Sequence, residues 1–195
     1  MSKVSIPSLQ PGTLYVVATP IGNLGDISAR AAQVLHDADI IVAEDTRHTL
    51  GLLNHLGVEG PRLISLHEHN EAGQVSRITA LLQSGARMAL VSDAGTPMIS
   101  DPGYRLVNKA KTLDLPVIAV PGPSAVTAAL SISGLPTDRF VFEGFLSARA
   151  EARRTRLRSL TSETRTLVFF ASPTRVQDAL TDTANLFGDD GRVAV

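Results

Sequence analysis

Short apolar runs alternate with helical patterns along most of the chain. Five runs in the first part are rich in β-formers and have the length of strands: 14–19, 39–44, 62–67, 88–93 and 116–120. They are nearly continuous in apolar residues, as strands are when both faces of their sheet are covered. We therefore predict five buried strands.

Helical spacing of apolar residues fills the intervals between these runs. The predicted helices span residues 28–38, 46–56, 71–84 and 102–112. Asp26 is expected to cap the first helix, and Asp101 followed by Pro102 to begin the last. Strict alternation of strand and helix predicts an α/β domain with a mainly parallel sheet.

The same pattern continues in the second part of the chain. It predicts a helix at 123–133, a strand at 140–145 and a basic helix at 150–160. A strand at 166–171 and a helix at 173–187 follow. The final segment "RVAV" (192–195) predicts a strand that has just begun, so we expect the chain to be a fragment. The expected organisation is a disordered lead-in at 1–11, an N-terminal α/β domain at 12–121 and a truncated second α/β domain at 122–195.

Composition narrows the class of protein. The 195 residues are 44% hydrophobic and 19% charged, which indicates a packed globular core. A net charge of −1 gives no global field that would attract nucleic acid or a membrane. The absence of cysteine excludes disulfides, thiolate metal sites and a cysteine nucleophile. No apolar run reaches the ~20 residues of a membrane span, and the N-terminus lacks the apolar core of a signal peptide. We expect a cytoplasmic protein.

Four polar turns follow four of the predicted strands, at residues 19–26, 43–49, 92–103 and 120–125. The carboxyl ends of parallel strands share one edge of the sheet, where ligands usually bind. Any one of these turns alone is explained by ordinary loop chemistry. Four of them on one edge predict a polar rim that holds a ligand.

The chemistry of the rim argues against a phosphate chain. The sequence contains neither GxGxxG nor GxxxxGK[ST]. The four turns contain no lysine and one arginine, whereas Asp26, Asp45, Asp93 and Asp101 would repel phosphates. S-adenosylmethionine fits such a rim, because it carries adenine, a ribose diol, an amino-acid head and a sulfonium cation but no phosphate. A sugar or an amino acid would fit as well.

The segments "TPIGNLGDIS", "AEDTRHT", "SDAGTPMISDPG", "VPGPSA" and "GLPTDRFVFEGFL" resemble, in order and spacing, the tetrapyrrole-methylase superfamily. Within it they are similar to the branch that methylates the ribose 2′-hydroxyl of a cytidine in 16S ribosomal RNA. The resemblance implies two α/β domains with S-adenosylmethionine in the cleft between them, a homodimer, and a chain that continues past Val195. The expected partner is 16S ribosomal RNA or the small ribosomal subunit. The alternatives are a methyltransferase of the same fold that acts on a tetrapyrrole or a protein side chain, and a non-catalytic nucleoside- or RNA-binding module.

The resemblance also assigns residues to the donor pocket. They are Thr19, Pro20, Gly22, Ser92, Asp93, Ala94, Gly95, Thr96, Pro121, Gly122, Ser124 and Ala125, with Phe145 as a further candidate. Turn geometry alone is the competing explanation for the glycines. Asp93 either accepts hydrogen bonds from the donor or caps a turn.

A ribose hydroxyl is a poor nucleophile, so a proton acceptor should assist the reaction. Asp45 or His48 is the candidate acceptor, and Arg47 is the candidate for holding an RNA phosphate. The competing interpretation is that Asp45 caps the following helix while Arg47 and His48 lie on its exposed first turn. A base beyond Val195 is a third possibility.

Candidate RNA contacts come from the first turn and from two further regions. Asn23 belongs to the first turn, and His67, His69 and Asn70 follow the third strand, with both histidines on one face if that strand continues. We prefer a polar rim to a metal site there, because a third metal ligand is not evident. Residues 149–165 contain six arginines against two glutamates, and Arg149, Arg153, Arg154 and Arg156 are candidates for following an RNA backbone. A solvated helix face is the competing explanation.

Overall fold

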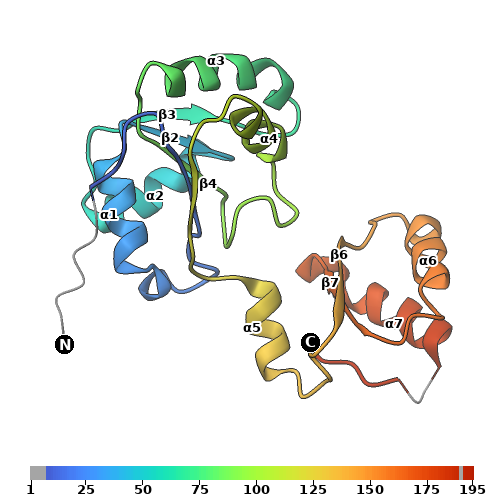
Figure 1. Cartoon of the computed structure of the whole chain (residues 1–195). Helices are drawn as coiled ribbons and strands as arrows, with labels where there is room; N and C mark the ends of the chain where they lie inside the picture. The colour runs from blue at the N-terminus through green and yellow to red at the C-terminus, as the bar shows by residue number, and fades with distance from the viewer. Residues whose placement is uncertain (1–7, 189–190) are drawn as a thin grey trace. The chain divides into compact units, whose positions relative to one another are not determined.

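The chain consists of two compact units. A computed structural model describes residues 8–188 and 191–195. It divides the chain into Met1–Ala125 and Val126–Val195 (Figure 1). The division follows residue 125, whereas the sequence pattern placed the boundary after residue 121. Each unit is described by itself.

The first unit is built on a parallel sheet of five strands. These are β1 (Leu14–Val17), β2 (Ile40–Ala43), β3 (Arg62–Ser65), β4 (Met88–Val91) and β5 (Val117–Val120), in the order β3-β2-β4-β1-β5. All residues of the three central strands are buried, whereas the edge strands β3 and β5 are partly exposed. The five strands fall within the five apolar runs, so the prediction of a parallel α/β sheet is confirmed.

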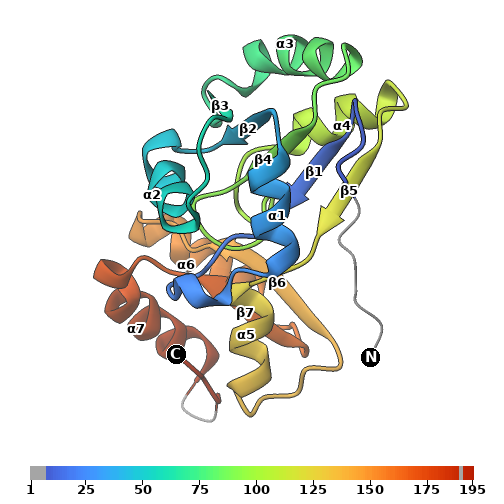
Figure 2. The same ribbon diagram turned by 90° about the vertical axis from the view of Figure 1, so that its left-hand side faces the viewer.

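Helices cover both faces of this sheet. They are α1 (Ala29–Asp37), α2 (Thr46–Leu56), α3 (Glu71–Gln83) and α4 (Tyr104–Thr112). The connections from β1 to β3 run toward one side of the sheet, and those from β3 to β5 run back toward the other. Because such crossovers are right-handed, this reversal places α1 and α2 on one face and α3 and α4 on the opposite face (Figures 1 and 2).

The hydrophobic core accordingly has two layers. Val17 of β1 belongs to a buried cluster with Leu35 of α1 and Leu53 of α2. Val16, the preceding residue, belongs to a second cluster with Ile78 of α3 and Leu106 of α4. Successive strand residues point to opposite faces, which is why each central strand contributes to both layers.

Two helix starts differ from the sequence-based expectation. Ser28, not Asp26, caps α1, since its Oγ accepts a hydrogen bond from the N–H of Ala31 at 3.0 Å. Asp26 instead ends a short 3₁₀ turn, η1 (Leu24–Asp26). Helix α4 begins after Gly103 and receives no cap from a side chain of its own N-cap residue. Asp101 therefore lies in the preceding loop and does not begin the helix.

The predicted lead-in is only partly within the described residues. Residues 1–7 lie outside them. Leu9, in contrast, is buried in the cluster under α1 and α2, and the N–H of Gln10 donates to the Tyr15 hydroxyl at 2.8 Å. The segment from Leu9 onward is thus packed on the sheet, and the expectation of disorder is wrong there.

The second unit follows the predicted order of elements. Its elements are α5 (Ala125–Ile132), which begins at the last residue of the first unit, β6 (Phe140–Phe145), α6 (Ala150–Ser159), β7 (Thr166–Phe170), η2 (Pro173–Arg175) and α7 (Val176–Phe187). Strands β6 and β7 pair in parallel. The strand expected at 192–195 is wrong, because residues 191–195 adopt no regular structure. Within the described residues, no helix is long and apolar enough to cross a membrane.

Candidate functional site

The loops that follow β1 and β4 are joined directly. These strands are neighbours in the sheet, and their outgoing connections run in opposite directions, which is where ligands bind in open α/β sheets. The N–H of Thr19 donates to the carbonyl of Gly95 at 2.9 Å, and the N–H of Gly95 donates back to Thr19 at 3.0 Å. The Thr19 hydroxyl also donates to the Ser92 carbonyl at 3.2 Å. The two bends are therefore fixed against each other.

The loop after β5 joins the same group. The hydroxyl of Thr96 donates to the carbonyl of Pro123 at 3.1 Å. A Cβ added to Gly122 would lie 3.1 Å from the Cβ of Ala18, at the end of β1. Glycine at position 122 thus allows the β5 loop to approach the β1 loop more closely than a larger residue would.

The loop after β2 completes the rim. The main-chain N–H of Asp45 donates to the Asp93 carboxylate at 3.1 Å, which ties this loop to the β4 loop. The Ser65 hydroxyl at the end of β3 donates to the Glu44 carbonyl at 3.3 Å. The four glycine- and aspartate-bearing turns meet along one edge of the first unit, as the sequence predicted. We call these turns, 18–28, 44–49, 92–103 and 121–124, the rim loops.

The residues assigned to the donor pocket differ in accessibility. Three are buried, namely Thr19, Ser92 and Gly95. Four are half-buried, namely Pro20, Asp93, Thr96 and Ser124. Five are exposed, namely Gly22, Ala94, Pro121, Gly122 and Ala125. The buried members hold the bends together, as Asp93 and Thr96 also do. The exposed members are open to contact with a ligand.

Phe145 lies in the second unit. Its side chain is exposed, and its ring packs edge-on against Phe170 with 5.2 Å between the centroids. Together with Ser147, Arg153 and Arg175 it lines a pocket of about 330 Å³. An exposed aromatic ring that lines a small pocket is suited to stacking on a flat ligand.

The turn that contains the proposed catalytic residues also has a structural role. Asp45 is the N-cap of α2, and its carboxylate accepts the Arg47 N–H at 2.8 Å. Arg47 also donates to Asp45 through Nη2 at 2.7 Å. These hydrogen bonds hold the pKa of Asp45 well below its usual range, which makes this carboxylate a weak proton acceptor. His48 lies exposed on the first turn of α2.

Two other carboxyl groups on the rim have the opposite shift. Burial raises the pKa of Glu44, and the nearby charges of Asp101 and Asp93 raise it further. Burial likewise raises the pKa of Asp101, with a smaller contribution from Asp93 and an opposing hydrogen bond from Ser92. The sequence analysis named Asp101 as a rim carboxylate and a helix start, but it assigned neither residue to catalysis or to donor binding. The signal was present for Glu44, which is the last residue of a predicted strand, but its half-buried environment depends on the folded loops.

The raised pKa of Asp101 predicts a pH-dependent effect on stability. A carboxyl group whose pKa is higher in the folded state than its ordinary value of 3.8 favours folding at low pH, and this contribution is lost as the pH rises through the folded-state pKa. We expect Asp101→Asn to raise the melting temperature near pH 7.5 by roughly 2 °C, a small effect because the side chain is only half-buried. The gain should vanish below pH 3.8 in thermal melts. Asp26→Asn, at an exposed rim position, should not change the melting temperature at either pH. If Asp101→Asn raised the melting temperature equally at both pH values, the gain would not come from the raised pKa of Asp101.

The candidate RNA contacts near β3 are held in a turn. The strand ends at Ser65, so the condition under which both histidines would share one face of a strand is not met. The Asn70 side chain accepts the His67 N–H at 2.9 Å and donates to the Ser65 carbonyl at 3.1 Å. The two histidine rings are exposed, with centroids 6.0 Å apart. Across the described residues, no group of three or more His, Asp or Glu is placed to hold a metal ion. Asn23, in the first rim loop, caps η1 by accepting the Gly25 N–H.

Arg153 is a correction to the expected basic surface. Its side chain is 5% exposed and forms an ion pair with Asp182 of α7, with Nη2 2.7 Å from the carboxylate. A further N–H donates to the Ser147 carbonyl at 3.2 Å. Arg153 therefore joins α6 to α7 and is not accessible to an RNA backbone.

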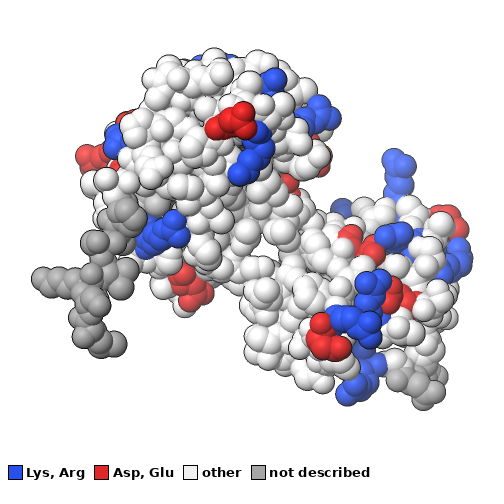
Figure 3. Space-filling model, in the orientation of Figure 1, with Lys and Arg blue, Asp and Glu red and all other residues white. Residues whose placement is uncertain are grey.

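The other arginines are accessible but mostly paired. Arg154 contacts the second oxygen of Asp182 at 2.8 Å, and Arg156 is paired with Glu143 of β6. Arg149 is exposed at the start of α6. Figure 3 shows acidic and basic side chains interleaved over the visible face of this unit. The arginine-rich segment thus presents a mixed surface and not a continuous basic stripe.

Several proteins with similar sequences carry the same name. A ribosomal RNA small subunit methyltransferase I from Xylella fastidiosa is 56% identical over 95% of this chain and 67% of its own length. Proteins of the same name from Pseudomonas aeruginosa and Escherichia coli O157:H7 are 51% and 49% identical over 96% and 94% of this chain, and over 66% and 64% of their own lengths. The chain spans about two thirds of the length of these curated relatives.

Solved structures show the same fold at lower sequence identity. A diphthine synthase superposes with a TM-score of 0.67 and 18% identity, over 89% of this chain and 71% of its own. A uroporphyrin-III-C-methyltransferase from Thermus thermophilus gives a TM-score of 0.60 and 23% identity, over 89% and 73% of the two chains. The sequence profile of the tetrapyrrole (corrin/porphyrin) methylases matches residues 13–195. The chain therefore belongs to the tetrapyrrole methylase family and, within it, to the group of ribosomal RNA small subunit methyltransferase I proteins.

Proposed function

We propose that the protein transfers a methyl group from S-adenosylmethionine to the ribose 2′-hydroxyl of a cytidine in 16S ribosomal RNA. The observation that carries this proposal is the set of rim loops, fixed to one another by the Thr19–Gly95 pair and the Asp45–Asp93 contact. The shared name of the relatives supports small-subunit ribosomal RNA as the substrate. The choice of a cytidine, and of its 2′-hydroxyl as the methylated group, comes from the resemblance of the sequence motifs to that branch of the family.

The rim fits S-adenosylmethionine in its chemistry. When bound, this donor supplies a methyl group on a positively charged sulfur. Half-buried carboxyl groups at Glu44, Asp93 and Asp101 favour a cationic ligand or ribose hydroxyls over a phosphate chain. Gly22 and Gly122 are exposed and allow a flat ring to approach the main chain. Phe145 is proposed to contact the donor from the second unit.

Transfer requires a route for the proton of the hydroxyl. The ribose oxygen forms a bond to the methyl carbon as the carbon–sulfur bond breaks, its electron pair returns to sulfur, and the hydroxyl proton passes to a base. Asp45 is the weaker candidate, because its carboxylate is occupied by Arg47 and by the end of α2. We propose His48 as the acceptor. Glu44, whose raised pKa makes it a better acceptor than an ordinary carboxylate, is the second candidate.

The RNA is proposed to lie on accessible polar side chains. Asn23 lies in the first rim loop, and His67 and His69 follow β3; all three are exposed. The Arg47 side chain is 88% exposed and available to a phosphate. In the second unit, Arg149, Arg154 and Arg156 keep this proposed role. A homodimer, implied by the resemblance, and a cytoplasmic location, expected from the sequence, stay predictions.

The proposal is tested by methylating small ribosomal subunits from a strain that lacks the gene. Purified full-length protein and radioactive S-adenosylmethionine should label one 16S nucleotide. A 2′-O-methyl group blocks the hydroxyl that attacks the neighbouring phosphate in alkali, so the label should appear in an alkali-resistant dinucleotide that contains cytidine. Label released as a mononucleotide would place the methyl group on a base and contradict ribose methylation.

The same assay separates the alternatives. A tetrapyrrole- or protein-directed enzyme would leave ribosomal RNA unlabelled and would label uroporphyrinogen or a protein fraction. A non-catalytic module would bind the nucleoside without any transfer. Either result would overturn the proposed function.

A further inference from the structure

We infer that Glu71 is a positioning residue for the donor, because its buried carboxylate holds the end of the rim loop 92–103. This inference rests on the proposed function, since it concerns the same site. Glu71 is the first residue of α3 and is 7% exposed. It has no place in the motifs that carry the family resemblance.

The carboxylate of Glu71 replaces a missing helix cap. One of its oxygens accepts the N–H of Gly103 at 3.1 Å and the N–H of Arg105 at 2.9 Å. The N-cap residue of α4 is Gly103, which has no side chain to do this. A negative charge at the first turn also interacts favourably with the helix dipole. Helix α4 is thus capped from another helix.

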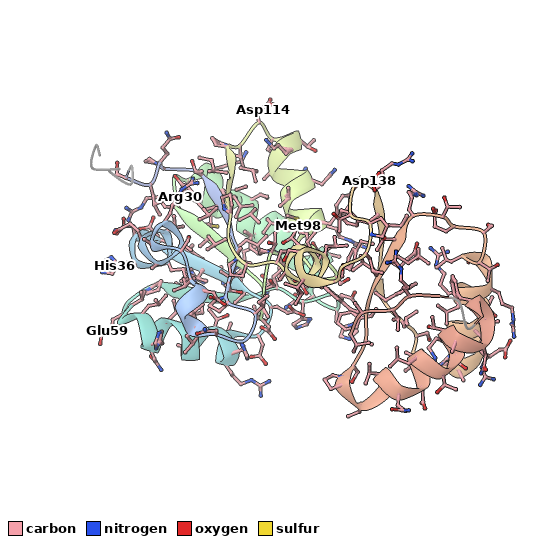
Figure 4. The ribbon with its side chains drawn as sticks, turned by 90° about the horizontal axis from the view of Figure 1, so that it is seen from below. Arg30, His36, Glu59, Met98, Asp114 and Asp138 are labelled. Atoms are coloured by element: carbon pink, nitrogen blue, oxygen red, sulfur yellow. The ribbon has the colours of Figure 1, made fainter. Side chains whose placement is uncertain are left out.

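The loop held in this way is conformationally strained. Met98 and Ser100 have φ angles of 71° and 72°, in the left-handed region that residues with a side chain seldom adopt. Figure 4 labels Met98 in this loop. Strained conformations persist only when surrounding contacts fix them. The Thr19–Gly95 pair fixes one end of the loop, and Glu71 fixes the other.

The external cap also explains the environment of Asp101. An aspartate at the N-cap would turn its carboxylate toward the first N–H groups of the helix, but Asp101 lies two residues before the N-cap Gly103. Because Glu71 occupies those groups, Asp101 remains half-buried on the rim, near Ser92 and Asp93. Loss of Glu71 would free Gly103 and Arg105 to recruit Asp101, which would reshape the loop.

The experiment compares variants of Glu71 by titrating full-length protein with S-adenosylhomocysteine at 15 °C. We expect Glu71→Ala and Glu71→Asp to bind about tenfold more weakly, because neither side chain reaches both N–H groups. Glu71→Gln keeps the acceptor oxygen at the same reach and should stay within about threefold of wild type. If the negative charge of Glu71 alone were responsible, the uncharged side chain of Glu71→Gln would not keep the affinity near that of wild type.

The matched control is Asp39→Ala. The Asp39 carboxylate also joins two segments, accepting the Arg87 N–H at 2.9 Å, but it lies at the amino ends of β2 and β4, away from the rim. This variant should lower the melting temperature without changing affinity more than about twofold. Wild-type affinity in Glu71→Ala and Glu71→Asp would overturn the inference alone. No binding by wild-type protein would overturn the proposed function, and the inference with it.

Discussion

Replacing Gly95 by alanine is expected to weaken binding of S-adenosylhomocysteine about thirtyfold in the full-length protein. Gly95 has a φ of 82°, and a Cβ at this position would lie 3.3 Å from Cγ2 of Ile21 in the neighbouring rim loop. The side chain would therefore both strain the bend and push it away from Thr19, its hydrogen-bonding partner. Calorimetric titration measures the change in affinity.

Gly57→Ala separates donor binding from general destabilisation. Gly57 ends α2 with a φ of 65°, but nothing lies within 4 Å of the position its Cβ would take. Both alanine variants should lose roughly 1–2 kcal/mol of unfolding free energy from left-handed strain. Only Gly95→Ala should lose affinity. If Gly95→Ala binds as tightly as Gly57→Ala, the bend does not shape the donor pocket.

Removing the carboxylate of Asp182 should lower the melting temperature of the second unit by roughly 10 °C. Asp182 and Arg153 are both almost fully buried, and the carboxylate accepts hydrogen bonds from Arg153 and Arg154 at 2.7 and 2.8 Å. In Asp182→Ala the guanidinium of Arg153 would stay buried, with the Ser147 carbonyl as its one remaining hydrogen-bond partner among the described residues. Hydrogen exchange over α6 and α7, with differential scanning calorimetry, measures the loss.

Two comparisons make this prediction specific to burial. Glu163→Ala removes an ion pair of similar length, 2.6 Å to Arg165, but Arg165 is 47% exposed, so the melting temperature should fall by no more than about 2 °C. The double substitution Arg153→Met with Asp182→Leu should recover most of the loss, because apolar side chains can replace a buried pair. A drop in Glu163→Ala as large as that in Asp182→Ala would refute the argument.

The sheet and its rim were predictable because they depend on local patterns. A buried strand such as β4 is a continuous run of apolar residues in the sequence, and the turn that follows it is rich in glycine, proline and aspartate. Parallel topology then places the ends of several strands on one edge without further information. The position of Gly95 beside Thr19 follows from the pairing of β1 with β4, which the alternation of strands and helices does not specify.

The residues that were misjudged are those whose partners are distant in sequence. Asp101 before Pro102 has the local signature of a helix start, but the cap comes from Glu71, which lies about thirty positions earlier. Arg153 and Arg154 are adjacent in one basic run, yet one is buried and the other half-exposed. A helical spacing that aligns Arg153 with buried Leu157 was the available signal, and Asp182 was needed to explain it.

The order of strands has a consequence for synthesis of the protein. Strand β1 is made first, but its two neighbours in the sheet are β4 and β5, which end at residues 91 and 120. Until the ribosome has released both, an apolar segment with two unpaired hydrogen-bonding edges must wait in the nascent chain, which is the type of segment that aggregates or recruits chaperones. The earliest strand is consequently enclosed only when β5 has been made, and the Thr19–Gly95 pair between the donor loops can form only after β4 has emerged.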